Sequence, residues 1–494
     1  MSNRPETNKQ SCPVYKKCGG CQLQNLSYPE QLEFKQKKVE KLLKRFCTVE
    51  KIIGMKTPYH YRNKVQAAFY TDKKGKIISG VYQSGSHHVV GIDSCQTEDV
   101  IADKIIVAVR KLLPSFRMTT YNEDTGKGFL RHILVKRGFA TNQIMLVLVT
   151  GTPVFPSKNN FVKAILKQFP EITTIVQNIN PYRTNLVLGD NQKVLYGKGY
   201  IEDILCGCRF RISPKSFYQI NPVQTEVLYG KAIEFANLKG NETVLDTYCG
   251  IGTIGIIAAK NGAGNVIGAE LNGDAVRDAI VNARANNLKN IRFYKADAGE
   301  FMREAADEDE KTDVVFMDPP RAGSDRKFLD SLIKMSPKKV VYVSCNPETL
   351  ARDLAYLTQN SLYKAQKIQP VDMFPHTAHI ETVVLLSHKK ADSYIHIDVE
   401  FGEGEGKIPV DSIAKRAEAY KPKEKVTYKM IKEYIEAKYG FKVHTAYIAE
   451  VKRNLGLPMY DAPNAVEELK QPRKHPTPEK VEAIKDALRY FAVI

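Results

Sequence analysis

Cys345 is a candidate nucleophile because it lies where an apolar strand gives way to a helix. Residues 340–344 form a hydrophobic run, and Asn346 and Pro347 are typical of the N-cap and first position of a helix. A helix N-terminus favours a thiolate, and strand ends face a crevice in many α/β proteins. The alternative is an inert cysteine packed in the core. The neighbouring motifs favour the nucleophile.

A glycine-rich turn and a downstream acid indicate a cofactor site. The strand 243–246 ends in Asp246, and the chain continues through Gly250 and Gly252, where backbone can approach a ligand closely. The next strand, NVIGAE, ends in Glu270, 24 residues after Asp246. A carboxylate at this position binds ribose hydroxyls in dinucleotide-type folds. Such a site suits NAD or S-adenosylmethionine.

Two further acids end later strands. IRFYKAD ends at Asp297, and TDVVFMD ends at Asp318 in DPPRAGS. Two prolines after an acid make a rigid loop that can present polar atoms to a flat base, so this turn favours S-adenosylmethionine and a nucleobase methyltransferase. Strands alternating with helices predict an α/β fold with a Rossmann-like, mixed seven-stranded sheet and ligands at the strand ends.

Methylation of a pyrimidine carbon requires a nucleophile. C5 of uracil becomes nucleophilic after a thiolate adds at C6, and a base must then remove the C5 proton. Cys345 fits the first role, and Glu381, at the start of the last predicted strand, fits the second. His376 and His379 are alternative bases, and an ordinary edge-strand glutamate is the structural alternative for Glu381.

Four cysteines near the N-terminus predict a metal centre. Cys12, Cys18 and Cys21 lie in CPVYKKCGGC, whose glycines let the backbone fold back so that thiolates face one point. Cys95, in a polar turn after a strand-like run, is the best fourth ligand. Four thiolates suit zinc or an iron–sulfur cluster, and the spacing does not separate the two.

Composition narrows the class of protein. The 494 residues are 43% hydrophobic and 26% charged, which predicts a globular protein of several domains. No apolar run is long enough to span a membrane, and the N-terminus is unlike a signal peptide, so we expect a cytoplasmic protein with no membrane partner. The net charge of +18 favours a nucleic-acid partner, although a solvated lysine-rich surface would give the same excess.

The region before residue 219 is rich in predicted strands and basic residues, which favours an RNA-binding module. A polar cluster at residues 62–64 lies within a strand pattern, and the predicted hairpin 129–150 begins with a basic strand. Solvent-facing side chains of a sheet are the alternative. The candidate RNA contacts are Arg62, Lys64, Arg131 and, in the DPPR turn, Arg321.

Together these motifs resemble the bacterial RNA (uracil-5-)-methyltransferases of the iron–sulfur type, most closely those acting on 23S rRNA. The resemblance covers residues 12–389 and rests on CPVYKKCGGC, YRNK, LRH, FYQINPVQ, LDTYCGIGT, DPPRAG, VSCNP and MFPHTAHIE. It implies a flipped target uridine, Cys345 as nucleophile and Glu381 as base. It implies a 4Fe-4S cluster on Cys12, Cys18, Cys21 and Cys95, and S-adenosylmethionine contacts from Gln219, Tyr248, Glu270 and Asp318, with Gly250, Gly252 and Asp297 at the same cofactor.

The resemblance leaves alternatives open. A tRNA substrate is the nearest, because the chemistry is the same; cytosine methylation and an RNA-binding protein with an inactive methyltransferase fold rank lower. Many relatives carry a small β-barrel before the cysteines, and with eleven residues ahead of Cys12 we expect none here. No feature of the sequence predicts an obligate protein partner.

Four segments are predicted. The sequence predicts amphipathic, lysine-bearing helices after residue 389. Their lysines are compatible with added RNA affinity and equally with a solvated surface. The segments are 1–98 (the iron–sulfur cysteine segment and the start of the RNA-binding module), 99–218 (the β-rich central RNA-binding module), 219–389 (the methyltransferase domain) and 390–494 (a basic, mainly helical extension).

Overall fold

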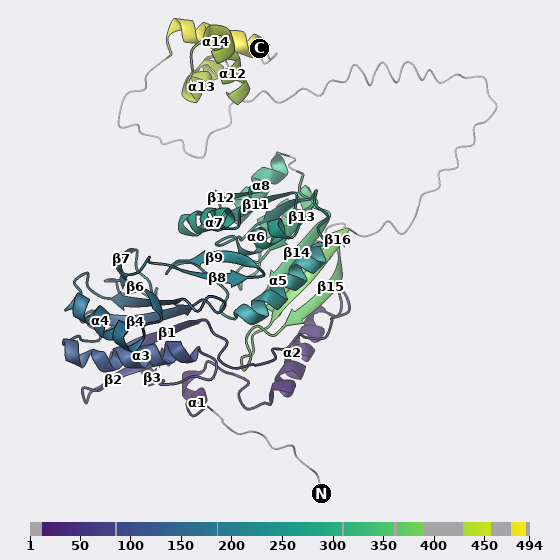
Figure 1. Cartoon of the computed structure of the whole chain (residues 1–494). Helices are drawn as coiled ribbons and strands as arrows, with labels where there is room; N and C mark the ends of the chain where they lie inside the picture. Colours follow the sequence, from purple (N-terminus) through teal and green to yellow (C-terminus); the bar gives the residue numbers. More distant parts are fainter. Residues whose placement is uncertain are drawn as a thin grey trace. The chain divides into compact units, whose positions relative to one another are not determined.

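The computed structural model describes residues 12–83, 86–184, 186–308, 311–359, 363–388, 428–455 and 476–490 (Figure 1). The chain forms two compact units, Met1–Ser393 and Tyr394–Ile494. The first holds two seven-stranded sheets and the second is helical. The finer division of the first unit stays a prediction. No helix within the described ranges is long and apolar enough to cross a membrane.

The C-terminal sheet of the first unit has the predicted mixed α/β form. Its strand order is β12-β11-β10-β13-β14-β16-β15, and β16 alone runs antiparallel to its neighbours. Its strands are β10 (Thr243–Asp246), β11 (Asn265–Glu270), β12 (Ile291–Lys295), β13 (Val314–Met317), β14 (Lys339–Ser344), β15 (Tyr363–Val371) and β16 (Glu381–His388). The predicted strand ends at Asp246, Glu270 and Ser344 are confirmed.

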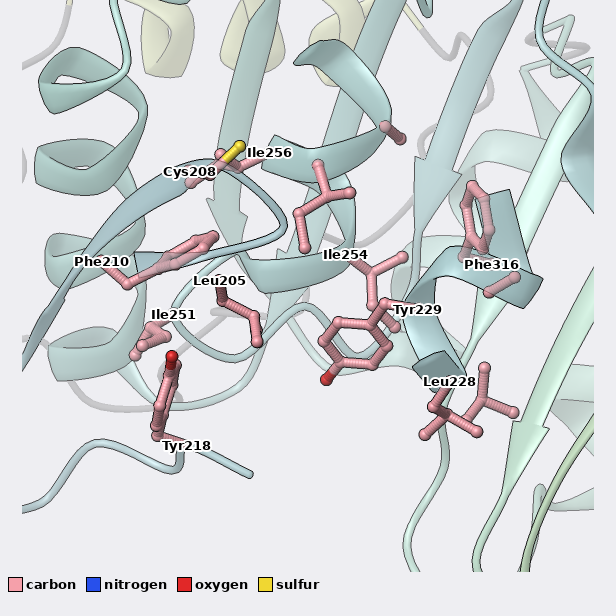
Figure 2. Packing of buried hydrophobic residues seen from close by; sticks show 14 of the residues in the cluster. Leu205, Cys208, Phe210, Tyr218, Leu228, Tyr229, Ile251, Ile254, Ile256 and Phe316 are labelled. Atoms are coloured by element: carbon pink, nitrogen blue, oxygen red, sulfur yellow. The ribbon is translucent and has the colours of Figure 1, made fainter. Parts of the chain in front are cut away.

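Helices cover both faces of this sheet because its central strands are apolar on both sides. One face packs against α5 (Pro222–Ala236), α6 (Thr253–Lys260) and α7 (Gly273–Ala285). Figure 2 shows this core, in which the hairpin of β8 (Ile201–Leu205) and β9 (Cys208–Ile212) contributes Phe210. The other face packs against α8 (Ala298–Asp307), α9 (Arg326–Met335), α10 (Pro347–Gln359) and, from the N-terminal region, α2 (Tyr28–Leu43).

The N-terminal sheet has the order β3-β2-β1-β4-β5-β6-β7 and is antiparallel except where β5 and β6 pair. Helices predicted near 99–113 and 158–168 are confirmed as α3 and α4, and the hairpin 129–150 as β4 and β5. The elements are α1 (Tyr15–Cys18), β1 (Lys64–Thr71), β2 (Ile77–Tyr82), β3 (Val89–Gly91), α3 (Val100–Leu112), η1 (Pro114–Phe116), β4 (Leu130–Arg137), β5 (Ile144–Thr150), α4 (Lys158–Gln168), β6 (Ile172–Ile179) and β7 (Asn191–Tyr196).

The sequence predicts that the basic strand β4 faces RNA, but this strand does not lie at the surface of the sheet. β4 lies in the middle of the sheet, between β1 and β5. Arg131 is 1% exposed, pairs with Glu123 at 2.7 Å, and donates to the carbonyl oxygens of Asn180 and Tyr182. The prediction of Arg131 as an RNA contact is therefore wrong, because a central strand is covered on both faces and its guanidinium has partners inside the module.

Three helices pack around an apolar core in the part of the second unit that the structure describes. They are α12 (Tyr428–Tyr439), α13 (Thr445–Asn454) and α14 (Pro478–Tyr490), all three predicted from the sequence. Gly440 ends α12 with φ +73°, as expected for its stop. The sequence also predicts a turn-rich segment at residues 400–412 and a helix stop at Gly456, and both lie outside the described residues.

The label "basic" does not suit this extension. Residues 394–494 carry 18 Lys and Arg against 16 Asp and Glu, so nearly all of the +18 charge belongs to the first unit. Lys438 pairs with Asp486 at 2.8 Å and Lys442 with Glu436 at 3.3 Å. These pairs reduce the charge that α12 and the following turn offer to an RNA.

Separate cores predict separate unfolding. Ile435 is fully buried in the helical unit, and Ile435→Ala should lower the stability of that unit by about 2–5 kcal/mol through lost burial and a cavity. Calorimetry of the full chain should show one transition moving down while that of the first unit stays in place. Glu436→Ala, on the exposed face of the same helix, is the matched control. A single transition that shifts as a whole would contradict the prediction.

Candidate active site

The pairing of β14 with β16 brings Cys345 and Glu381 to one edge of the sheet. The strands are antiparallel, and their last pair on this side is Ser344 with Thr382. Cys345 directly follows Ser344, and Glu381 directly precedes Thr382. The carboxyl end of one strand therefore meets the amino end of the other, although 36 residues separate the two side chains in sequence.

Cys345 occupies the predicted junction of strand and helix. Helix α10 begins at Pro347, and the Asn346 side chain accepts a hydrogen bond from the Glu348 amide at 3.1 Å, as an N-cap does. The thiol is half-buried. Burial, then the carboxylates of Glu381 and Asp318, raise its pKa to about 11, against the lowering effect of Arg321. This shift is opposite to the easier ionisation expected at a helix terminus, because burial and two acids outweigh the effect of the terminus.

Glu381 is 3% exposed. Burial, followed by repulsion from Asp318, raises the pKa of its carboxyl well above the usual value, while Arg321 acts in the opposite direction. Asp318 and Arg321 therefore act on the pKa values of both Cys345 and Glu381.

Arg321 is fastened at this edge by α10. Its carbonyl oxygen accepts hydrogen bonds from the side chains of Asn346 (3.1 Å) and Thr349 (3.2 Å). Its guanidinium is exposed and lies 3.5 Å from the Nε2 atom of His379. The predicted RNA contact thus stands beside Cys345 and Glu381 and is accessible.

The glycine-rich turn after β10 has the backbone shape that the sequence requires. Gly252 has φ +82°, and a Cβ there would lie 2.7 Å from the Phe293 ring, so both conformation and space exclude a side chain. Gly250 has φ +55°, and its amide donates to Glu270 at 3.1 Å. Glu270 also accepts from the Asn272 amide at 2.8 Å, which holds its carboxylate beside the turn. A cavity of about 430 Å³ opens here, between Gly250, Glu270 and Phe217.

Two other strand-end acids are desolvated. Asp246 accepts from the Gly255 amide at 2.8 Å, but its second carboxylate oxygen is buried and has no hydrogen-bond partner among the described residues. Burial raises the pKa of both Asp246 and Asp318 to about 7. Low-polarity surroundings that disfavour an anion favour its pairing with a cation. The sulfonium and ammonium groups of S-adenosylmethionine are cations, so this donor set fits that cofactor.

The other predicted cofactor contacts have identifiable neighbours. The Gln219 side chain hydrogen bonds with the buried Tyr229 hydroxyl, which lies near Asp318. Tyr248 stacks at 5.6 Å on Phe328. Asp297 is exposed and caps α8, accepting from the Gly299 amide at 2.9 Å, so one of its oxygens already has a structural use.

Comparison with known proteins agrees with this geometry. Residues 176–389 match the protein-family model for tRNA (Uracil-5-)-methyltransferase. A Bacillus cereus protein named as an uncharacterized RNA methyltransferase is 44% identical over 388 residues, 78% of this chain and 84% of its own. One from Listeria monocytogenes is 46% identical, over 76% of this chain and 83% of its own. The crystal structure of Pyrococcus abyssi tRNA (uracil-54, C5)-methyltransferase with S-adenosyl-L-homocysteine matches with a TM-score of 0.63 and 31% identity, covering 74% of this chain and 85% of that one.

The chain belongs to the RNA (uracil-5-)-methyltransferase family. It is an S-adenosylmethionine-dependent enzyme that acts on RNA.

The four cysteines of this methyltransferase lie in one region. Burial raises the pKa of Cys21 to about 12, and the neighbouring thiols of Cys95, Cys18 and Cys12 add to the effect. Within the described ranges, no three His, Cys, Asp or Glu side chains are arranged to hold a metal ion. Arg62 is half-buried and lies near the Tyr61 hydroxyl, the Glu98 carboxylate and the Cys95 thiol, and its role as an RNA contact stays a prediction. Lys64 is exposed.

The two histidines ranked behind Glu381 differ in environment. His376 is 3% exposed, and both ring nitrogens have partners, the Gln31 side chain and the Pro58 carbonyl oxygen. Because both of its ring nitrogens are hydrogen bonded inside the protein, His376 has a structural role and is not placed to act as a general base. His379 is half-buried, and burial followed by the charge of Arg321 lowers its pKa.

Sequence reasoning missed Tyr229 and the support beneath the DPPR turn. In the sequence, Tyr229 looks like one more residue of the apolar face of α5, and no neighbouring residue indicates a role for its hydroxyl group. Asp353 accepts from the Tyr342 hydroxyl (2.7 Å) and the Ser324 amide (3.0 Å), which ties α10, β14 and the turn together. In the sequence, Asp353 is one acid within the helix ETLARDLAYL, and it gives only a weak sign of a buried role because most such residues face solvent.

The raised pKa of Cys345 predicts slow alkylation by iodoacetamide in the free methyltransferase. The thiolate is the reactive form, so with a pKa of about 11 the rate should rise about tenfold per pH unit between pH 7 and 9. Arg321→Gln should slow alkylation further, because that cation lowers the pKa. Mass spectrometry of the Cys345 peptide gives the rates, with Arg326→Gln as control. A plateau below pH 9 would contradict the assignment.

Proposed function

We propose that this enzyme methylates C5 of uridine in 23S rRNA, with Cys345 as the nucleophile and Glu381 as the proton acceptor. The observation that supports these roles is the register of β14 and β16, which brings the Cys345 thiol next to the buried carboxylate of Glu381. A nucleophile and a proton acceptor side by side are what C5 methylation requires.

The proposed reaction conserves atoms and electrons. The Cys345 sulfur forms a bond to C6 of uracil, and the C5=C6 electron pair moves toward O4 as an enolate. C5 then takes a methyl group. Glu381 removes the C5 proton, the C5=C6 bond re-forms, and the C6–S bond breaks to return the thiolate.

Two features of the chain suit these steps. Arg321 favours the ionised forms of both Cys345 and Glu381. Bound S-adenosylmethionine supplies the methyl group together with a positive charge. Held beside Asp318, that charge would offset one of the two carboxylate effects that raise the pKa of the Cys345 thiol.

The residues that would hold the cofactor follow from the strand-end edge. Glu270, already oriented by Gly250 and Asn272, suits the ribose hydroxyls, and Asp318 and Gln219 lie beside Tyr229. Gly252 gives the backbone its close approach, and Tyr248 offers an aromatic face. Asp297, with one free carboxylate oxygen beside its cap, is the proposed adenine contact.

The choice of RNA has two candidates. The four-cysteine motif and the resemblance to the 23S rRNA enzymes support ribosomal RNA. The Pyrococcus abyssi enzyme, 31% identical, is named for uracil-54 of tRNA, and this supports tRNA as the second candidate. Lys64 and Arg321 are the proposed RNA contacts, since both are exposed.

Tritium release from RNA labelled at C5 of uridine tests residues and substrate together. The wild-type enzyme should release tritium from 23S rRNA transcripts and not from tRNA. Cys345→Ala should reduce release by at least about 10³-fold, because no adduct forms. Glu381→Gln should slow it by about 10²–10⁴-fold while a covalent enzyme–RNA adduct accumulates.

The outcomes separate the two parts of the proposal. Release from tRNA alone would keep the mechanism and overturn the substrate. Retained release by Cys345→Ala would overturn the covalent mechanism. Cys249→Ala, which changes a buried cysteine of the cofactor turn, controls for general effects of losing a thiol near the site.

We further propose that Cys12, Cys18, Cys21 and Cys95 hold a 4Fe-4S cluster. Burial raises the pKa of Cys18 and Cys21, and the neighbouring thiols add to this, the expected effect of like charges that a cationic centre would offset. A zinc ion binds all of its ligands at one atom, whereas a 4Fe-4S cluster binds thiolates at four separate corners. The four cysteines are neighbours but lack the close arrangement of a single-ion site, so a cluster suits them better.

Anaerobically purified enzyme should contain about four iron ions and about four sulfides per chain. Cys95→Ser should reduce both, because it removes one ligand. Cys47→Ser is the matched control, since Cys47 is half-buried but bonds to the Gln366 carbonyl oxygen instead. About one zinc per chain without sulfide would contradict the cluster.

A further inference from the structure

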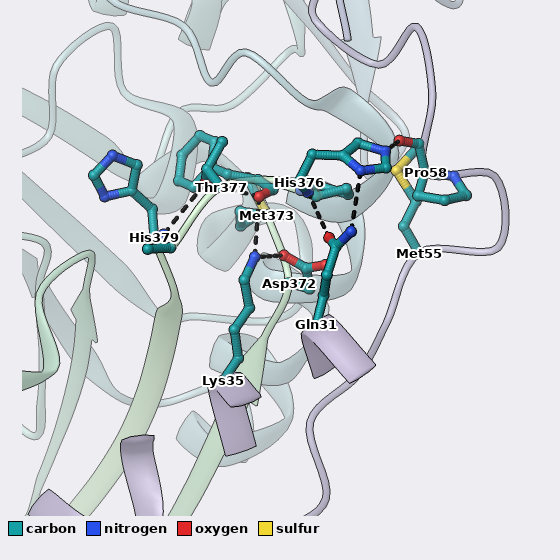
Figure 3. A network of polar contacts seen from close by, with 12 residues as sticks. Gln31, Lys35, Met55, Pro58, Asp372, Met373, His376, Thr377 and His379 are labelled. Atoms are coloured by element: carbon teal, nitrogen blue, oxygen red, sulfur yellow. Dashed lines mark hydrogen bonds and ion pairs between the residues drawn. The ribbon is translucent and has the colours of Figure 1, made fainter. Parts of the chain in front are cut away.

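The loop that leads from β15 to Glu381 is held from below by helix α2 (Figure 3). The Lys35 ammonium lies 2.6 Å from the Asp372 carboxylate and donates to the Phe374 carbonyl oxygen at 3.0 Å. Both charged side chains are completely buried. An ion pair without solvent competition fixes the start of the loop, because either partner alone would be an uncompensated buried charge.

A second contact fixes the middle of the loop. The Gln31 side chain accepts from the His376 amide at 2.8 Å, and its Nε2 atom lies 3.2 Å from His376 Nδ1. A carbonyl oxygen only accepts, so the contact of His376 Nε2 with Pro58 O at 2.9 Å places the ring proton on Nε2. Nδ1 then accepts from Gln31. His376 has φ +69°, a conformation that a non-glycine residue keeps only when its surroundings impose it.

The cysteine segment contacts the same loop. The Leu23 amide donates to the His376 carbonyl oxygen at 2.9 Å, and the Gln22 side chain accepts from the Ala378 amide at 3.2 Å. Both residues directly follow Cys21. On the other side of the loop, the Tyr61 hydroxyl donates to the Pro375 carbonyl oxygen at 2.9 Å.

The loop itself is too tightly bonded to absorb a displacement. The Thr377 hydroxyl donates to the Phe374 carbonyl oxygen at 2.8 Å and accepts from the His379 amide at 3.2 Å. Only four residues lie between His376 and Glu381. A shift of His376 therefore moves the start of β16, where the Glu381 carboxylate is attached.

We propose that α2 and residues 22–23 are a clamp that positions Glu381 for removal of the C5 proton, with Gln31 and His376 as the positioning residues. The clamp rests on the proposed role of Glu381. Its specific consequence is that loosening it slows resolution of the methylated adduct and leaves formation of that adduct by Cys345 largely unchanged. A role in stability alone would lower the amount of folded enzyme, and with it the amount of adduct formed, but would leave the rate of adduct decay unchanged.

Single-turnover kinetics with labelled S-adenosylmethionine and RNA separates the two steps. Denaturing gels follow the methylated protein–RNA adduct, and its first-order decay does not depend on the fraction of enzyme that is folded. Gln31→Met removes the hydrogen bonds at similar volume. His376→Asn keeps a residue that adopts positive φ and removes the ring. Gln36→Met is the matched control, because Gln36 lies on the same helix but accepts from the Ile52 amide instead.

In Gln31→Met and His376→Asn, adduct decay should slow by about tenfold to a hundredfold, as expected for a displaced catalytic group, while adduct formation stays within about twofold of wild type. Gln36→Met should leave both rates unchanged. Equal slowing of both steps, or no change in decay, would overturn the clamp. If Glu381→Gln itself accumulates no adduct, the role of Glu381 fails, and the clamp's effect on that carboxylate fails with it.

Discussion

Reversal of one strand determines what this enzyme can do. In a wholly parallel sheet, residues that precede a strand lie at the opposite edge from residues that follow its neighbour. Because β16 runs antiparallel between β14 and β15, its first residue shares an edge with the residue after β14. Cys345 and Glu381 meet for this reason, at the same edge as Glu270 and Asp318. The cofactor turn, the DPPR turn and the loop before β16 all serve to line this edge.

Desolvation gives the edge its electrostatic character. Asp246, Asp318, Glu381 and Cys345 all have raised pKa values, and burial is the main cause in each. The free site therefore disfavours negative charge and stabilises a bound cation. A sulfonium methyl donor is such a cation, and Asp318, which also raises the pKa of Cys345, is the residue that the proposed cofactor site and the proposed nucleophile share.

The N-terminal region extends this support. Val39 and Leu43 of α2 pack in one core with strands of the methyltransferase sheet, while Lys35 and Gln31 of the same helix bond to the loop before Glu381. Residues from the start of the chain therefore contribute to both the packing and the polar contacts of the catalytic half. The second unit, with its own core and nearly balanced charge, does not share in the positive charge of the first.

The sequence by itself determined the local elements and the chemistry on offer. Strand ends at Asp246 and Glu270, the Asn346 cap before α10 and the helices α2, α3 and α4 follow from periodicity, capping and glycine placement, which are short-range effects. Only the tertiary structure decided which side chains face solvent and which meet. Arg131 is buried because β4 is central, Arg62 is half-buried near the Cys95 thiol, and the pKa of Cys345 is raised because the thiol is buried beside acids from other parts of the sequence. The Lys35–Asp372 pair joins residues 337 positions apart, and no local pattern records such a contact, because burial and pairing depend on how the whole chain packs.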